Sequence, residues 1–297
     1  MRFLVTGSGG QLGICLVQKI GASAGHVLAA APGHAQLDVA DRAAVCAALD
    51  AARPDAVVNA AAFTWVDRCE TERELAWRIN AEAPGLLAQE CAARGIRLVH
   101  VSTDYVFDGE ARRPYTEEDP VSPRTEYGRG KLEGERRVGD AMPGALVVRT
   151  SWVFGPGRNF IATMLGAADR RRAEGGEAPL RVVDDQFGSP TYAGDLASWI
   201  LLLVEGEARG LYHLANRGVA TWWEVAREAL DLAGFREVPI ERVGTGEFPR
   251  PAPRPAYSAL GCAKADAAGV VRRGWRAALA AYLASDDTPL RTIGEKP

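Results

Sequence analysis

Cysteine and histidine are scarce in this chain, and neither is grouped as it would be around a metal ion. The 297 residues include four histidines and five cysteines, namely Cys15, Cys46, Cys69, Cys91 and Cys262. The cysteines are odd in number, lie far apart and form no CxxC pair, which argues against a disulfide framework and against a zinc site. We therefore expect reduced thiols, no bound metal and a cytoplasmic location.

An excess of positive charge and a long apolar run are also missing. The formal net charge is -3, which argues against nucleic acid or an anionic membrane as the main partner. No apolar run approaches the length of about 20 residues that a membrane span needs. The first residues have the pattern of a strand and a turn rather than of a signal peptide. A hydrophobic content of 47% and a charged content of 25% are ordinary for a globular protein.

Short apolar runs at regular spacing indicate the fold class. Their brevity and their Val, Ile and Leu content are typical of parallel strands that are buried on both faces. Stretches with helical character lie between them, and this alternation predicts an α/β fold with a doubly wound parallel Rossmann sheet. The predicted strands are FLV (3–5), HVLAA (26–30), DAVVNA (55–60), IRLVHV (96–101) and ALVVRT (145–150), and the predicted helices cover 41–52, 72–93 and 125–140.

After residue 150 the alternation becomes looser, which predicts a smaller C-terminal α/β substrate-binding lobe. We expect a dinucleotide-binding domain over 1–150 and a mainly substrate-binding lobe over 151–297, with about 180–205 returning to the first domain. The segment 180–205 contains a predicted strand followed by an apolar helix.

Two features of the second lobe have more than one interpretation. Thr221 and Glu224 have the spacing of a capping box at the start of a helix that Gly234 ends. Its adjacent tryptophans, 222–223, could form a binding platform, but an amphipathic helix needs an apolar face, so we assign them to packing. The segment FPRPAPRP (248–255) could bind a proline-recognising domain, but we interpret it as a stiff loop within the second lobe.

A glycine-rich loop follows the first predicted strand and precedes a helix. Gly7, Gly10 and Gly13 are spaced as G-x-x-G-x-x-G. A dinucleotide needs a tight turn, close approach of the main chain to its pyrophosphate and a helix N-terminus that points free N–H groups at the phosphates. The position of the motif between strand and helix supports this interpretation over that of a merely tight turn.

The sequence gives a weak signal on which dinucleotide is bound. An acidic residue at the end of the second strand would favour NAD, and a basic one NADP. Neither lies close by in the segment that follows the second predicted strand, and Asp38 comes slightly later. We expect weak discrimination, with NADPH somewhat preferred over NADH by analogy.

Tyr127 and Lys131 are four residues apart on a predicted helix and therefore share one face. A nearby ammonium stabilises a phenolate, so we expect Lys131 to lower the pKa of Tyr127. Such a tyrosine can donate a proton to a carbonyl oxygen while hydride arrives at the carbon. The same lysine can hold the nicotinamide ribose.

Four polar side chains follow one another where the fourth predicted strand ends. In Rossmann sheets the ligands bind at this carboxyl edge. We expect Thr103 to polarise a substrate carbonyl together with Tyr127, Ser102 to support the cofactor, and Asp104 and Tyr105 to reach the substrate. A capped strand end is the alternative.

Taken together, these residues resemble the extended short-chain dehydrogenase/reductase superfamily, and within it the dTDP-4-dehydrorhamnose reductase family. The resemblance covers most of the chain. Its markers are TGSGGQLG, RPDAVVNAAAFTWVD, NAEAPGLLA, VSTDYVFDG, YGRGK, VVRTSWVFGPG, VVDDQFGSPTYAGDLA and RPAYSAL. Sugar-nucleotide epimerases share the glycines and the Tyr–Lys pair but usually lack STDYVFDG and DDQFGSPT.

The resemblance implies that the chain reduces the C4 keto group of dTDP-4-dehydro-L-rhamnose with NADPH or NADH. It assigns the catalytic roles to Thr103, Tyr127 and Lys131. It places the cofactor against Gly7, Gly10, Gln11, Leu12, Gly13, Asp38, Val39, Ala60, Ala61, Ala62, Ser102, Tyr127 and Lys131. It places the nucleotide sugar against Val66, Thr103, Asp104, Tyr105, Tyr127, Trp152 and Arg254.

The chain also departs from the family pattern, and other functions stay open. The family often has Asn at the position of Tyr257. Some relatives bind Mg²⁺ at a dimer interface through a glutamate where Cys15 stands here, and a thiol is a poor ligand for that cation, so we expect no magnesium-linked dimer. A homodimer of another kind is an open alternative. The competing functions are a 4-ketoreductase or epimerase for another nucleotide sugar and a non-catalytic NADP-binding regulatory subunit.

Overall fold

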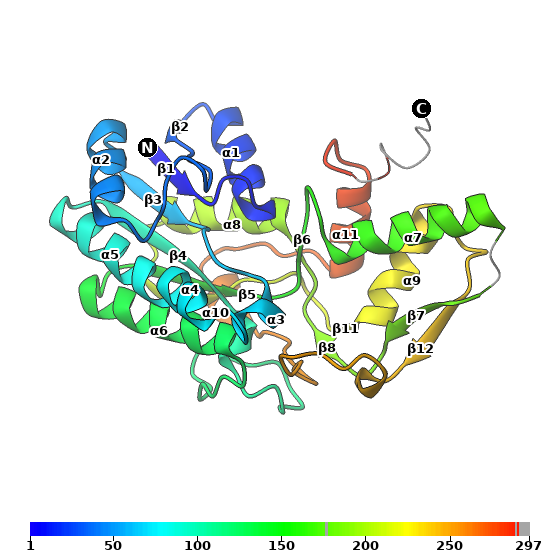
Figure 1. Cartoon of the computed structure of the whole chain (residues 1–297). Helices are drawn as coiled ribbons and strands as arrows, with labels where there is room; N and C mark the ends of the chain where they lie inside the picture. The colour runs from blue at the N-terminus through cyan, green and yellow to red at the C-terminus, as the bar shows by residue number, and fades with distance from the viewer. Residues whose placement is uncertain (176–177, 289, 291–297) are drawn as a thin grey trace.

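The structure is a computed structural model that describes residues 1–175, 178–288 and 290. The last part of the predicted lobe 151–297, residues 291–297, therefore lies outside the described residues. Figure 1 shows two unequal lobes side by side. We call the part around the central sheet the first lobe, and the part formed mainly by residues 160–183, 222–243 and 275–283 the second lobe.

The central sheet has six strands, all of them parallel, and this confirms the predicted fold class. The five predicted strands are all present. The sequence analysis missed the sixth, which extends the sheet beyond the strand that ends at Thr150. In spatial order the strands are β10 (Gly210–His213), β5 (Leu146–Thr150), β4 (Arg97–Thr103), β3 (Ala56–Asn59), β1 (Arg2–Thr6) and β2 (Val27–Ala30).

Helices cover both faces of the sheet, as a doubly wound fold requires. Phe3 and Val5 of β1 pack with α1 and α8, whereas Leu4 between them packs with α2 and α5. This alternation follows from the two-residue period of a strand. The helices of the first lobe are α1 (Gln11–Ala22) and α8 (Ala193–Glu205) on one face, and α2 (Arg42–Ala52), α5 (Ala83–Ala93) and α6 (Glu126–Ala141) on the other.

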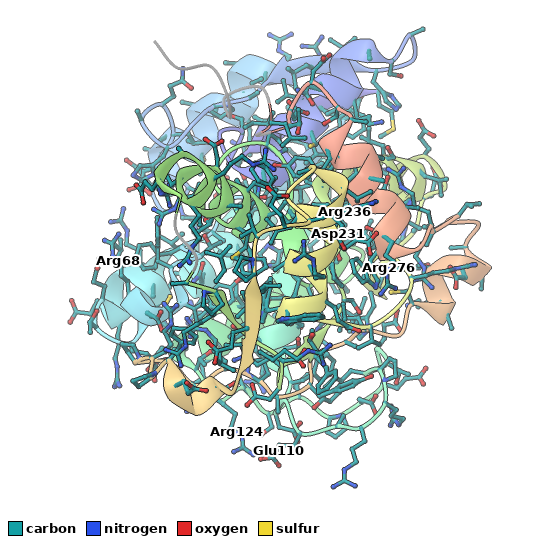
Figure 2. All side chains as sticks on the ribbon, turned by 90° about the vertical axis from the view of Figure 1, so that its right-hand side faces the viewer. Arg68, Glu110, Arg124, Asp231, Arg236 and Arg276 are labelled. Carbon is teal, nitrogen blue, oxygen red and sulfur yellow. The ribbon has the colours of Figure 1, made fainter. Side chains whose placement is uncertain are left out.

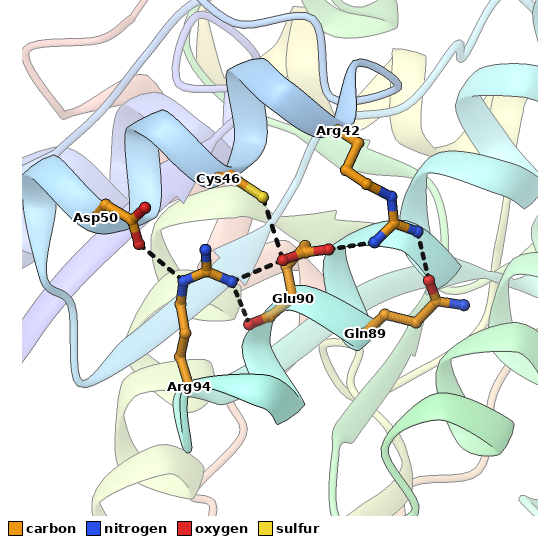
Figure 3. A network of polar contacts seen from close by, with 6 residues as sticks. All are labelled: Arg42, Cys46, Asp50, Gln89, Glu90 and Arg94. Carbon is orange, nitrogen blue, oxygen red and sulfur yellow. Dashed lines mark hydrogen bonds and ion pairs between the residues drawn. The ribbon is translucent and has the colours of Figure 1, made fainter.

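A surface network of polar side chains joins α2 to α5 (Figure 3). Glu90 of α5 lies at its centre and accepts from Arg42, from the Cys46 thiol at 3.2 Å and from Arg94 at 2.7 Å. Arg94 also donates to Asp50 at 2.9 Å. The pKa of the Glu90 carboxyl is lowered, with the Arg94 hydrogen bond as the largest cause.

The predicted helix over 72–93 is interrupted in the structure. A π-helical turn, Arg78–Glu82, separates α4 (Arg73–Trp77) from α5. Within it, the Asn80 side chain accepts from the Phe63 amide at 2.9 Å and donates to the Phe63 carbonyl at 3.0 Å. The turn therefore fixes the loop after β3, which also contains the short helix α3 (Val66–Cys69).

The second lobe has its own apolar core, to which Leu165, Leu230 and Tyr282 contribute. The helix α9 begins with the predicted capping box, in which Glu224 N donates to Thr221 Oγ1 at 3.1 Å and Thr221 N donates to the Glu224 carboxylate at 2.9 Å. The elements of this lobe are α7 (Phe160–Glu174), β7 (Leu180–Val183), α9 (Trp222–Leu232), β12 (Ile240–Val243) and α11 (Trp275–Leu283).

Figure 2 labels Asp231 of α9 and Arg276 of α11, two charged side chains of the second lobe. Arg276 Nε donates to Glu228 at 3.2 Å and so joins the two helices. Since Arg276 is well exposed, this ion pair adds little to stability.

The remaining elements are short. They are the strand pairs β6 (Val153–Phe154) with β9 (Thr191–Tyr192) and β8 (Phe187–Gly188) with β11 (Ala220–Thr221), the 3₁₀ turns Asp104–Val106 and Thr245–Glu247, and α10 (Ala263–Ala267), which lies against β10. Within the described ranges, no helix combines the length and the apolar character that crossing a bilayer requires.

Candidate active site

A cleft of about 1450 Å³ lies between the two lobes, at the carboxyl ends of β1, β3, β4 and β5. Residues of the glycine loop, of the loop after β3 and of the end of β4 form one side. Residues of α7, β7, α9 and the proline-rich segment 248–255 form the other. Ligands of doubly wound folds bind at this edge of the sheet.

The glycine loop has the close main-chain contacts that its sequence predicts. Gly7 has a φ of +67°, and a Cβ there would lie 2.7 Å from main-chain atoms of Ala60 and Ala61. A Cβ on Gly13 would lie 2.2 Å from the Gly7 carbonyl oxygen. The helix α1 starts here with no side-chain cap and no acidic residue in its first turn, so its N–H groups are free to bind phosphate.

Tyr127 and Lys131 lie together on α6, buried below the floor of the cleft. The N-terminus of this helix is fixed by Thr125, whose hydroxyl accepts from Gly128 N at 3.0 Å, and by Glu70, which accepts from Glu126 N at 2.9 Å. Only 8% of Tyr127 and 1% of Lys131 are exposed. Both residues line the cleft.

The prediction that Lys131 lowers the pKa of Tyr127 is wrong. Burial raises the pKa of the Tyr127 phenol, and the Thr103 hydroxyl opposes this only in part. Burial also lowers the pKa of Lys131 to about 8, and its Nζ donates to the Val101 carbonyl at 2.7 Å. The ammonium is therefore engaged with the main chain of β4, and the phenol stays protonated at neutral pH.

Thr103 ends β4 and caps the short turn that follows. Its Oγ1 accepts from Tyr105 N at 3.3 Å and lies 3.0 Å from Asp104 Oδ1. Burial raises the pKa of Asp104 to about 6, and its Oδ2 has no hydrogen-bond partner among the described residues. The Ser258 hydroxyl is close enough to lower this pKa without reaching hydrogen-bond geometry.

Ser102 is hydrogen-bonded to a buried ion pair between Glu135 and Arg149. Its Oγ donates to Glu135 Oε1 at 2.5 Å, and Arg149 of β5 donates to both oxygens of Glu135, at 2.9 and 2.7 Å. Glu135 lies one helical turn after Lys131 and raises its pKa against the effect of burial. This network fixes the end of β4, which carries Val101, Ser102 and Thr103.

Trp152 lies on the opposite side of the cleft in a strained conformation. Its φ is +45°, which is unfavourable for a residue with a large side chain. Its ring stacks on that of Trp222, with centroids 3.7 Å apart and planes at 6°. A Cβ on Gly188 would lie 2.2 Å from the Trp152 ring. The motif VVRTSWVFGPG, which contains Trp152, therefore packs closely against the motif VVDDQFGSPTYAGDLA, which contains Gly188.

The structure brings most of the predicted site residues to one cleft. Of the cofactor residues, only Asp38 is absent from its walls; it pairs instead with Arg78 and accepts from Ala40 N at 2.9 Å. All of the predicted substrate residues line the cleft, although Arg254 also pairs with Asp67. The roles assigned to these residues stay predictions.

The sequence analysis missed several side chains on the walls of the cleft. Trp222 was assigned to packing, and it does pack on the second core, but it also lines the cleft and donates from Nε1 to Gln186 at 3.1 Å. The capping box next to it could have indicated its orientation. The other missed residues include His34, Trp65, Arg158, Phe160, Arg181, Gln186 and Arg250.

Comparisons with known proteins agree with this arrangement. A family model described as RmlD substrate binding domain matches residues 1–287. The chain is 45% identical over 283 residues to a Streptomyces antibioticus protein named "Probable dTDP-4,6-dihydroxy-2-methyloxan-3-one 4-ketoreductase", with 94% of this chain and 93% of the relative covered. It is 42% identical over 292 residues to the dTDP-4-dehydrorhamnose reductase of Mycobacterium tuberculosis, with 96% and 93% covered.

A solved structure is similar along nearly its whole length. It is the dTDP-4-dehydrorhamnose reductase of Bacillus anthracis in complex with NADP. The TM-score is 0.89 at 32% identity, and the match covers 95% of this chain and 98% of that one.

Proposed function

The chain belongs to the RmlD substrate-binding-domain family, and on that premise we propose that it reduces the C4 keto group of a dTDP-linked sugar with NADPH. The observation that carries the proposal is the grouping of Thr103, Tyr127 and Lys131 at the end of β4, in a cleft that also contains the glycine loop. The physiological substrate that we propose is dTDP-4-dehydro-L-rhamnose, which gives dTDP-L-rhamnose.

The residues of the first lobe fit a dinucleotide. Gly7 and Gly13 allow the tight main-chain packing of the loop, which a Cβ would prevent, and the uncapped N-terminus of α1 offers free N–H groups to a pyrophosphate. No acidic residue lies in the segment 31–34 after β2, which favours NADPH, since an acid there would repel its 2′-phosphate. When bound, NADPH supplies the hydride.

The residues at the end of β4 supply the acid. The raised pKa of Tyr127 keeps its phenol protonated, so that it can donate a proton to the substrate oxygen. Thr103 lies beside it and can hold the same oxygen, where negative charge develops. Lys131, whose pKa is about 8, can return a proton to Tyr127 after the reaction.

The test is NADPH oxidation, followed by absorbance, on addition of dTDP-4-dehydro-L-rhamnose made in situ. We expect rapid oxidation by the wild type and a kcat lower by roughly 10²–10⁴-fold for Tyr127→Phe, because that variant lacks the proton donor. The variant should bind NADPH within about two-fold of the wild-type affinity, since only a hydroxyl is removed. A variant with near-normal kcat would show that Tyr127 is not the acid.

The same assay distinguishes the competing functions. A 4-ketoreductase for another sugar would leave this substrate untouched and oxidise NADPH with a different 4-keto nucleotide sugar, and the 45% identity to the S. antibioticus relative makes this the second candidate. An epimerase would convert a sugar without net consumption of NADPH. A regulatory subunit would bind NADPH and oxidise it with no member of the panel.

We also propose that the protein is cytoplasmic. Its five cysteines are all unpaired, and four of them are buried, as expected of a reducing compartment. A homodimer stays a prediction, which sedimentation of the purified chain would test.

A further inference from the structure

A single carboxylate holds the proline-rich segment 248–255 against the first lobe. Asp67, at the start of α3, accepts from Arg254 at 2.8 Å and from the Ala252 amide at 3.3 Å. Arg250 is a weaker partner, at 3.5 Å. Three donors that are spread over five residues of one segment thus converge on one side chain.

The segment is anchored a second time where it leaves the cleft. A Cβ on Gly109 would lie 2.5 Å from Pro255 Cβ, and Tyr257 N donates to the Gly109 carbonyl at 3.0 Å. The prolines at 249, 251, 253 and 255 restrict the backbone between these points. The segment therefore crosses from the second lobe to the first, rather than lying within the second lobe as the sequence analysis expected.

Arg254 lines the cleft, whereas Asp67 is not among the residues of its walls. Burial raises the pKa of Tyr105, and the Arg254 charge opposes this rise, so the guanidinium lies near the predicted substrate residues. The Arg254 side chain is only 19% exposed, which is low for an arginine. Asp67 therefore acts from behind Arg254, as seen from the cleft.

The donors of Arg254 are only partly used. A guanidinium has five N–H groups. One donates to Asp67 and one to the Ala252 carbonyl at 2.9 Å, and the other three have no acceptor among the described residues, so they are available to a ligand. A diphosphate needs several such donors, and a guanidinium that is already oriented loses less entropy on binding.

We propose that Asp67 is a positioning residue that orients Arg254 toward the diphosphate of the nucleotide sugar. This inference rests on the proposed function, because it takes a nucleoside diphosphate as the ligand. Burial raises the pKa of Asp67, but the hydrogen bond and charge of Arg254, the Ala252 amide and the Arg250 charge outweigh burial and lower this pKa, so the carboxylate is ionised throughout the neutral range. Asp67 does not touch the substrate and does not take part in proton transfer.

The experiment is a double-mutant cycle on the binding of thymidine diphosphate, measured by titration calorimetry. We expect Asp67→Asn and Arg254→Gln each to weaken binding by about ten-fold, since each loses an oriented charged donor. Because both changes act on one contact, we expect Asp67→Asn to add less than about two-fold in the Arg254→Gln background. NADPH affinity should stay within about two-fold in all variants.

The matched control is Asp266→Asn. The Asp266 carboxylate accepts two hydrogen bonds from Arg272, at 2.8 and 2.7 Å, and neither residue lines the cleft. This variant loses a comparable ion pair but should bind thymidine diphosphate as the wild type does. A loss of affinity in the control as large as that in Asp67→Asn would assign the effect to general destabilisation and overturn the proposal.

Three other outcomes would also overturn it. If Asp67→Asn weakens binding equally with and without Arg254, the carboxylate does not act through that arginine. If Asp67→Asn binds more tightly, Asp67 competes with the diphosphate instead of orienting its partner. If the wild type does not bind thymidine diphosphate at all, the proposed function fails and this inference fails with it.

Discussion

On the first-lobe side of the cleft, the glycine loop and the end of β4 contribute main chain and buried polar side chains, whereas the second-lobe side contributes mainly aromatic rings and arginines. Lys131 is 1% and Thr103 is 6% exposed, and both have hydrogen-bond partners within β4 or its following turn. The side chains of Arg181 and Arg250, by contrast, are 45% and 58% exposed. The glycine loop and the end of β4 are therefore fixed before any ligand arrives, whereas Arg181 and Arg250 still have rotamer freedom.

The first prediction concerns the glycine loop on the first-lobe side of the cleft, which we call the rigid side. In Gly13→Ala the new Cβ would lie 2.2 Å from the Gly7 carbonyl oxygen, and that main-chain atom cannot move without shifting the loop. We expect NADPH affinity to fall by about 100-fold or more, since 3 kcal/mol corresponds to roughly that factor. Fluorescence titration of NADPH would measure it.

Gly9→Ala is the matched control for this change. Apart from Gly9 itself and its two chain neighbours, no described residue has an atom within 4 Å of a Cβ at Gly9, which is in the same loop and has no positive φ. We expect its NADPH affinity to match that of the wild type within about three-fold. Equal losses in both variants would mean that the loop needs glycine for flexibility and not for the close contact at Gly13.

The second prediction concerns the stacked tryptophans on the second-lobe side of the cleft. A Cβ on Gly188 would lie 2.2 Å from the Trp152 ring, so Gly188→Ala should displace this ring from its stack on Trp222. We expect the KM for the nucleotide sugar to rise by about ten-fold, with NADPH affinity unchanged, because one aromatic contact is worth on the order of 1 kcal/mol. Steady-state kinetics at saturating NADPH would measure it, and a loss of NADPH affinity of the same size would contradict the division of the cleft into two sides.

The same division separates what the sequence could predict from what it could not. Gly7, Gly13, Tyr127 and Lys131 act within local motifs, in which spacing along the chain determines spacing in the fold. Trp222 reaches the cleft only because α9 packs on the strand pair that contains Gly188, and no local pattern encodes that contact. The sequence therefore indicated the fold and the rigid side well, and the second side only where a resemblance supplied the residues.

Two errors on the first lobe have physical causes of the same kind. The strand β10 was missed because Gly210–His213 is short and has no apolar run, and its place in the sheet comes from pairing with β5. The pKa of Tyr127 was predicted in the wrong direction because spacing on a helix does not reveal burial. A neighbouring ammonium lowers a phenol pKa only where it outweighs desolvation, and here burial is the larger effect.

The third prediction concerns the loss of stability that results from burying the Lys131 ammonium on the rigid side. Its pKa is about 8 in the folded protein against 10.5 for an ordinary lysine, so folding disfavours the charged form. A difference of 2.5 pKa units corresponds to about 3 kcal/mol, and the lost hydrogen bond to Val101 offsets part of it. At pH 7 we therefore expect Lys131→Met to be more stable than the wild type, with a free energy of unfolding that is higher by about 1 kcal/mol.

The sign of the pH dependence makes this prediction specific. Below pH 8 the lysine is charged in both states and the penalty is constant, whereas between pH 8 and 10.5 only the unfolded chain keeps its proton, so the wild type gains stability relative to the variant. Urea unfolding at pH 7, 8.5 and 10 should show the advantage of Lys131→Met shrinking as the pH rises. If the difference in free energy of unfolding between the variant and the wild type stays constant over this range, Lys131 has an ordinary pKa in the folded protein. Burial would then not disfavour its charged form.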